Sequence, residues 1–192
     1  MRSKKWIWPV VVAVGVVVAV GVVVYTSSRP PSPTFEKKKG ESPSKLELEE
    51  GLVVPIGPNW KLSYRMEKGW ANYYEYIPTE ENLSNYTKMI RVVIGKGKKV
   101  NPARFIDRWA ALWEKGCPGG KVYLIDDNLS SSTPWSEVKG VCPHGPEIFA
   151  KGIEGKGGFY FVSILFKKGG DRDREGLEFV KNVRLKYREV GK

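Results

Sequence analysis

The chain has 192 residues, of which 41% are hydrophobic and 28% are charged, and it carries a formal net charge of +11. This length and composition are those of one folded domain with additional segments, and they exclude a chain that lacks a folded domain. The charge is high enough to attract anionic lipid or nucleic acid. Charge alone, however, argues for solubility and association, so we interpret it as a solvated basic surface.

A long uncharged segment near the start of the chain predicts a transmembrane helix. No charged side chain occurs between Trp6 and Ser28, and the apolar core runs from Ile7 to Tyr25. At a rise of 1.5 Å per residue this core is about 28 Å long, close to the hydrocarbon thickness of a bilayer. We therefore expect a cytoplasmic tail at 1–5, a membrane helix at 6–26, and membrane attachment through Ile7–Tyr25.

The charges that flank this segment predict its orientation. Arg2, Lys4 and Lys5 precede it, whereas only Arg29 follows it closely. By the positive-inside rule the N-terminus lies in the cytoplasm and the folded domain lies outside, in the periplasm or at the cell surface. The apolar run is longer than that of a cleaved signal peptide, which favours an uncleaved signal-anchor. Cleavage stays open as the alternative and would leave the domain on the same side.

The segment that follows is a predicted linker. Residues 27–45 are rich in proline, serine and lysine and hold too few apolar residues to build a core, so we expect them to be disordered. Apolar patterns then return, and we expect an extracytoplasmic α+β domain over residues 46–192.

Apolar alternation predicts the strands of this domain, and apolar residues at helical spacing predict its helices. Asn101 followed by Pro102 is typical of a helix start. In chain order we expect strands at 60–66, 70–77 and 86–94, a helix at 102–116, strands at 121–125, 135–142, 147–153 and 159–166, a helix from Asp171 or Asp173, and an edge strand within 184–190. Short turns between strands imply an antiparallel sheet covered by the two helices, with 159–166 at its centre.

Two finer expectations concern which side chains share a face. Strict alternation places four residues of the first strand on one face, namely Trp60, Leu62, Tyr64 and Met66. Helical spacing predicts one apolar stripe on the first helix, made of Phe105, Ile106, Trp109, Leu112 and Trp113. We expect the run from Asp126 to Asn128 to be a turn, because it lacks the full spacing of a calcium loop.

The two cysteines, Cys117 and Cys142, are expected to form one disulfide, because two cysteines in an oxidising compartment most simply pair. A metal site is not expected, since four ligands are needed and only His144 lies near. His144 is the single histidine of the chain, and no nucleophile and base stand in a recognisable pattern around it. We predict no catalytic residue, no metal and no cofactor, and we favour a protein that is not an enzyme.

An aromatic cluster on the second strand is a candidate binding face, made of Trp70, Tyr73, Tyr74 and Tyr76. Such rings can stack on bases or sugars, although packing against the core explains them at least as well. By alternation Trp70, Tyr74 and Tyr76 point one way and Tyr73 the other. Nucleic acid is not the partner we expect, because the domain is placed outside the cytoplasm.

The order of elements resembles that of PsbP/Mog1-like domains. The resemblance rests on the near-apolar strand within 155–166, the closing helix at 173–183, and the stretch at 85–94 followed by a proline-capped helix and paired Cys-Pro segments. The chain is also similar in these respects to membrane-anchored periplasmic proteins of bacteria. The resemblance implies a three-layer α/β sandwich and an accessory role at a membrane complex, and it carries over no catalytic residue or metal ligand.

The function we expect is therefore that of a membrane-anchored accessory or scaffolding domain that binds a protein partner in the cell envelope. One alternative is a ligand-binding or hydrolytic domain for polysaccharide or lipid, which would use the tyrosine-rich strand with Glu75, Glu80 and Glu81. A second alternative is nucleic-acid binding at the cell surface.

Overall fold

The computed structural model describes residues 46–48, 51–167 and 172–187. The predicted cytoplasmic tail, transmembrane helix and linker lie outside these residues. Within the described part of the chain, neither helix is long and apolar enough to cross a membrane.

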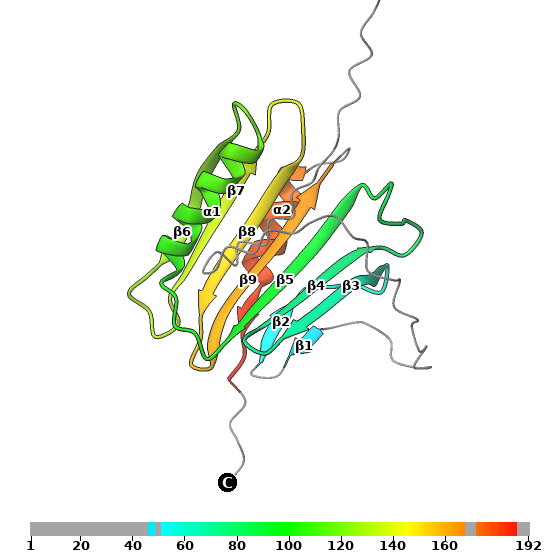
Figure 1. The fold of residues 1–192 in the computed structure, drawn as a ribbon. Helices are drawn as coiled ribbons and strands as arrows, with labels where there is room; N and C mark the ends of the chain where they lie inside the picture. Colours follow the sequence, from blue (N-terminus) through cyan, green and yellow to red (C-terminus); the bar gives the residue numbers. More distant parts are fainter. Residues whose placement is uncertain (1–45, 49–50, 168–171, 188–192) are drawn as a thin grey trace, which may run out of the picture. The chain divides into compact units, whose positions relative to one another are not determined.

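A seven-stranded antiparallel sheet forms the body of the domain (Figure 1). Its spatial order is β3-β4-β5-β9-β8-β7-β6, so β9 is the central strand, as predicted. The strands are β3 Trp60–Lys68, β4 Ala71–Pro78, β5 Lys88–Lys96, β6 Lys121–Asn128, β7 Trp135–Val141, β8 Glu147–Glu154 and β9 Gly158–Phe166. Every residue of β9 is buried, because the sheet is covered on both faces at this strand.

A second, three-stranded sheet was not predicted. It consists of β1 Leu46–Leu48, β2 Leu52–Val54 and β10 Arg184–Leu185, with β2 in the middle. Each strand is too short to show a periodic pattern, which is why alternation missed the first two. Leu52 and Val54 are fully buried, so this small sheet extends the main core.

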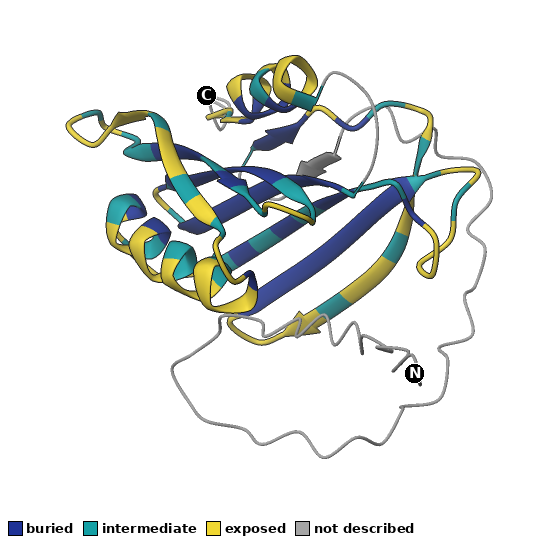
Figure 2. Ribbon diagram, turned by 90° about the horizontal axis from the view of Figure 1, so that it is seen from above, coloured by how far each residue is buried: buried dark blue, intermediate teal, exposed yellow. Residues whose placement is uncertain are grey.

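Two helices lie on opposite sides of the large sheet (Figure 2). Helix α1, Pro102–Gly116, packs on β6, β7 and β8, whereas α2, Arg172–Asn182, packs on β8 and β9. The side chain of Asn101 accepts a hydrogen bond from the backbone N–H of Arg104 at 3.1 Å, which confirms the predicted cap. The predicted α+β class, with an antiparallel sheet and two helices, is confirmed.

One prediction about side-chain faces is wrong, and the other holds for all but one residue. In β3 a bulge between Leu62 and Tyr64 adds one residue, so Leu62 lies opposite Tyr76 whereas Tyr64 lies opposite Glu75 on the other face. On α1 the predicted apolar stripe is confirmed for Phe105, Ile106, Trp109 and Trp113, which pack in or against core clusters. Leu112 is the exception, at 42% exposed. The run from Asp126 to Asn128 is also no turn, since it continues β6.

The main core lies between the large sheet and α2. Phe149 on β8 and Val180 on α2 are fully buried there, together with β-branched and aromatic side chains of β4, β5 and β9. Gly176 lets the helix approach this closely, because an added Cβ would lie 2.2 Å from Cδ2 of Phe149.

We expect Gly176→Ala to lower the free energy of unfolding by about 1–3 kcal/mol through overpacking. Helix propensity alone predicts the opposite sign, since alanine is favoured over glycine by about 1 kcal/mol within a helix. Gly116→Ala, at the end of α1, is the control, because no atom lies within 4 Å of its added Cβ. Denaturant unfolding measures both variants; a Gly176→Ala variant as stable as the parent would contradict the close approach.

The disulfide between Cys117 and Cys142 is present, with the two Cα atoms 5.9 Å apart. Cys117 directly follows α1 and Cys142 directly follows β7. The bond therefore encloses β6 and β7, the two strands at one edge of the large sheet.

Candidate functional site

The four aromatic residues proposed as a binding face do not lie on one surface. Tyr74 and Tyr76 are buried in the core on the α2 side of the sheet, where burial raises the pKa of Tyr76 to about 12. Tyr73 points to the opposite face, as alternation predicts, and it lies opposite Val93 of β5. Trp70 lies in the turn before β4 and is 44% exposed.

The glutamates near this strand are likewise separated. Glu75 is buried on the α1 side of the sheet, where it accepts a hydrogen bond from the Tyr73 hydroxyl. Glu81 binds the hydroxyl and backbone N–H of Thr87, and Glu80 is exposed. Glu75 and Glu81 therefore form hydrogen bonds with nearby residues. The three carboxylates do not converge on a shared pocket with the tyrosines.

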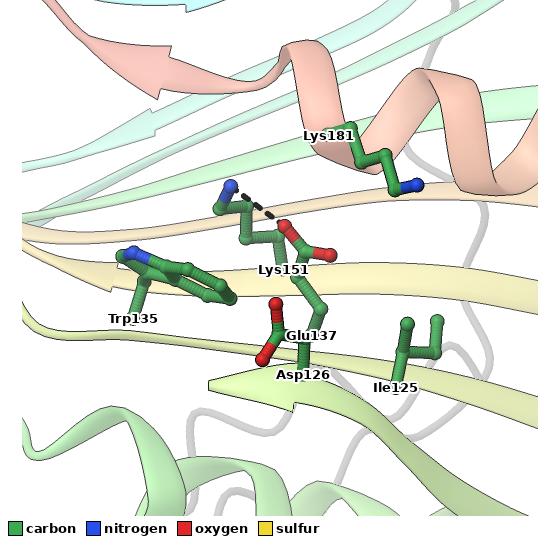
Figure 3. Close-up of a pocket in the computed structure, with 6 residues that line it drawn as sticks. All are labelled: Ile125, Asp126, Trp135, Glu137, Lys151 and Lys181. Carbon is green, nitrogen blue, oxygen red and sulfur yellow. Dashed lines mark ion pairs between the residues drawn. The ribbon is translucent and has the colours of Figure 1, made fainter. Parts of the chain in front are cut away.

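A pocket of about 420 Å³ lies instead at the other end of the sheet, beside α2 (Figure 3). Four elements contribute its lining: β6, β7, β8 and α2. The lining residues are Ile125, Asp126, Trp135, Glu137, Lys151 and Lys181.

A buried ion pair forms the floor of this pocket. Lys151 Nζ lies 2.7 Å from Glu137 Oε1, and the two residues are only 6% and 3% exposed. Lys151 Nζ also lies 4.5 Å from the centroid of the Trp135 ring and 3.4 Å from the carbonyl oxygen of Val180 in α2. The ammonium group thus has three partners: a carboxylate, an aromatic ring and a helix carbonyl oxygen. Figure 3 shows the first two.

Strand register places these charges in one row. Asp126 lies opposite Glu137, and Glu137 lies opposite Lys151. Two carboxylates directly opposite each other repel, so Lys151 compensates one of them while Asp126 stays exposed to solvent. The bulge between Leu124 and Asp126 produces this register, and no sequence pattern predicts the bulge.

The pocket is suited to binding polar groups. Its charges are mixed, with a carboxylate and an ammonium group at the exposed rim, from Asp126 and Lys181, and a neutralised pair below. None of its lining residues is a serine, cysteine or histidine. His144 lies exposed in the turn after β7, and no group of three metal-binding side chains occurs within the described residues.

Comparison with known proteins finds similarity to solved structures only. No protein-family model matches the chain, and no curated protein matches it. The chain is similar to the solution structure of cyanobacterial PsbP (CyanoP) from Synechocystis sp. PCC 6803. The TM-score is 0.48 and the sequence identity 10%, over 80% of this chain and 98% of that chain. A PsbP-like chain is therefore among the solved structures to which this chain is similar in shape.

Proposed function

We propose that the chain is a membrane-tethered accessory domain that binds a protein partner outside the cytoplasm, and that the pocket beside α2 holds a polar group of that partner. The observation that carries the proposal is the buried Glu137–Lys151 pair under an open rim. The rim presents the ammonium group of Lys181, from α2, and the carboxylate of Asp126, from β6, and the indole of Trp135 adds an apolar wall.

The ion pair argues for a role beyond stability. Removing two charges from water is costly, and replacing a buried pair by apolar residues of similar volume is often neutral or stabilising. A protein that needed only a core at this position would be served by apolar side chains. Charged groups held rigidly in a pocket are instead suited to orient a polar ligand group.

The tether and the compartment are supported by two separate observations. The uncharged run Ile7–Tyr25 has the length and flanking charges of a membrane anchor. The disulfide between Cys117 and Cys142 is of a kind that persists mainly outside the cytoplasm. A domain joined to such an anchor stays near the membrane, which suits an accessory subunit.

Affinity recovery of the full-length chain from solubilised native membranes tests this proposal. We expect a partner protein in stoichiometric amount, and we expect its loss with Lys181→Glu, which reverses an exposed charge at the rim. Trp135→Ala should also reduce recovery. Trp70→Ala is the matched control, because this tryptophan is exposed at the opposite end of the sheet.

Three outcomes would overturn the proposal. A monomer without partner in every detergent would remove the accessory role. Equal loss from Trp70→Ala and Trp135→Ala would show that partner binding is not specific to the pocket. Recovery of oligosaccharide or nucleic acid in place of protein would support one of the alternative functions.

A further inference from the structure

A second group of charged residues lies on the opposite face of the sheet from the pocket. On this face α1 covers β6, β7 and β8, and among the described elements no helix covers β4 and β5. The group, called here the Arg91 cluster, consists of Glu75, Tyr86, Arg91, Ser163 and Lys167. Arg91 lies between Glu75 and Ser163 in the strand register, so the three side chains form one row.

The Arg91 cluster contains a single carboxylate, that of Glu75. Glu75 Oε1 lies 3.0 Å from Arg91 Nε, and it also accepts the hydroxyl of Tyr73. The bond from Arg91 uses only Nε, and within the described part of the chain its two terminal nitrogens have no hydrogen-bond partner. The Arg91 side chain is 20% exposed, so solvent reaches it.

Lys167, directly after β9, adds a second cation. Its Nζ lies 3.5 Å from the centroid of the Tyr86 ring, and no carboxylate among the described residues pairs with it. Burial lowers the pKa of Lys167, and the charge of Arg91 lowers it further. Lys167 and Arg91 lie on the same face of the sheet, since Arg91 lies opposite Ser163 and Lys167 follows Ser163 by four residues. Glu75 pairs with only one of these two cations.

Ser163 provides an independent sign that a ligand group is accommodated here. Its side chain is fully buried, and its Oγ has no hydrogen-bond partner among the described residues. A buried hydroxyl without a partner is unfavourable and uncommon in folded proteins. Alanine would fill the same place at the centre of the sheet without this penalty, so the hydroxyl itself requires an explanation.

We propose that the Arg91 cluster is an anion-binding site that takes a carboxylate or phosphate group. The terminal nitrogens of Arg91 donate to two oxygens of the anion, a geometry that guanidinium favours. Lys167 supplies the second positive charge, and the Ser163 hydroxyl donates a hydrogen bond to the anion from the sheet. The excess positive charge and the unpaired hydroxyl are then satisfied by the same ligand. This site is separate from the pocket beside α2 and does not depend on the proposed function.

Titration of the full-length chain in a non-ionic detergent tests the site, with inorganic phosphate in one arm and sodium acetate in the other. The Nε–Hε signal of Arg91 in a nitrogen-proton correlation spectrum is the local readout, and thermal unfolding is the global one. We expect a saturable shift of this signal in at least one arm, with a dissociation constant on the order of 1 mM. The arm that saturates identifies the group as phosphate or carboxylate.

Three variants separate binding from folding. Lys167→Met leaves the Arg91–Glu75 pair intact and should weaken binding by about tenfold, as expected for one charge-assisted hydrogen bond. Lys156→Met is the matched control, since Lys156 also lies over a tyrosine ring, that of Tyr187, but away from the cluster. Ser163→Ala should raise the melting temperature of the unliganded protein by a few degrees and still weaken binding.

The proposal is overturned if neither anion shifts the Arg91 signal, or if Lys167→Met and Lys156→Met bind equally well. A Ser163→Ala variant that loses stability would show that the hydroxyl is satisfied inside the protein, for example by bound water, and would remove the argument from Ser163. Preserved anion affinity in that variant would contradict the assigned role of the hydroxyl.

Discussion

Lys151→Met should lower the free energy of unfolding by about 3–5 kcal/mol, because it leaves the buried carboxylate of Glu137 without its cation. Glu137→Leu should cost less. In that variant the ammonium group of Lys151 keeps the carbonyl oxygen of Val180 and the ring of Trp135 as partners. Denaturant unfolding followed by tryptophan fluorescence measures both variants.

A double variant at Glu137 and Lys151 tests whether the two residues act as a pair. Glu137→Leu combined with Lys151→Met should be more stable than Lys151→Met alone, because no charge is left buried. Lys88→Met is the control, since it breaks a more exposed pair with Glu175 and should cost below about 1 kcal/mol. Additive losses in the double variant would mean that the two residues do not act as a buried pair.

Removal of the disulfide is the second large effect. Replacing both Cys117 and Cys142 by serine should lower the free energy of unfolding by about 3 kcal/mol, as expected for the release of a loop of this length. The enclosed segment contains β6, an edge strand with mostly exposed side chains. We therefore expect the amides of β6 to lose protection in hydrogen exchange before those of β9.

Treatment with a reducing agent is the control for these substitutions. It should destabilise the parent protein by the same amount and leave the double serine variant unchanged. Equal stability of the parent and the double variant would contradict a structural role for the bond, and equal exchange in β6 and β9 would contradict its local effect.

The fold was largely predictable because its elements carry strong local patterns. The apolar run of β9 indicates a strand buried on both faces, and Asn101 with Pro102 marks the start of α1. Short turns then favour neighbouring antiparallel strands. These features predict the antiparallel sheet and the central place of β9, whereas the pairing of β5 with β9 joins strands that are not consecutive in the chain.

The errors arise where one inserted residue changes the register. In both β3 and β6 the register shifts, at Leu62/Tyr64 and at Leu124/Asp126. A shift of one residue moves every following side chain to the other face, and single-sequence alternation does not reveal where it occurs. For this reason alternation predicts the wrong face for Tyr64.

The pocket and the Arg91 cluster escaped prediction for a related reason. Glu137 and Lys151 come from different strands, and Lys181 comes from a helix far along the chain. Their proximity depends on strand register and on the packing of α2, neither of which has a sequence motif. The one available signal was the presence of charged residues at inward positions of otherwise apolar strands, as in β7 and β8.

Site-specific photocrosslinking in native membranes tests the central claim most directly. A photoreactive side chain at position 181, on the rim of the pocket, should give one dominant adduct with a protein partner. The same group in place of Leu112, exposed on α1, should not. Adducts of equal yield from both positions, or none from position 181, would contradict binding at this pocket.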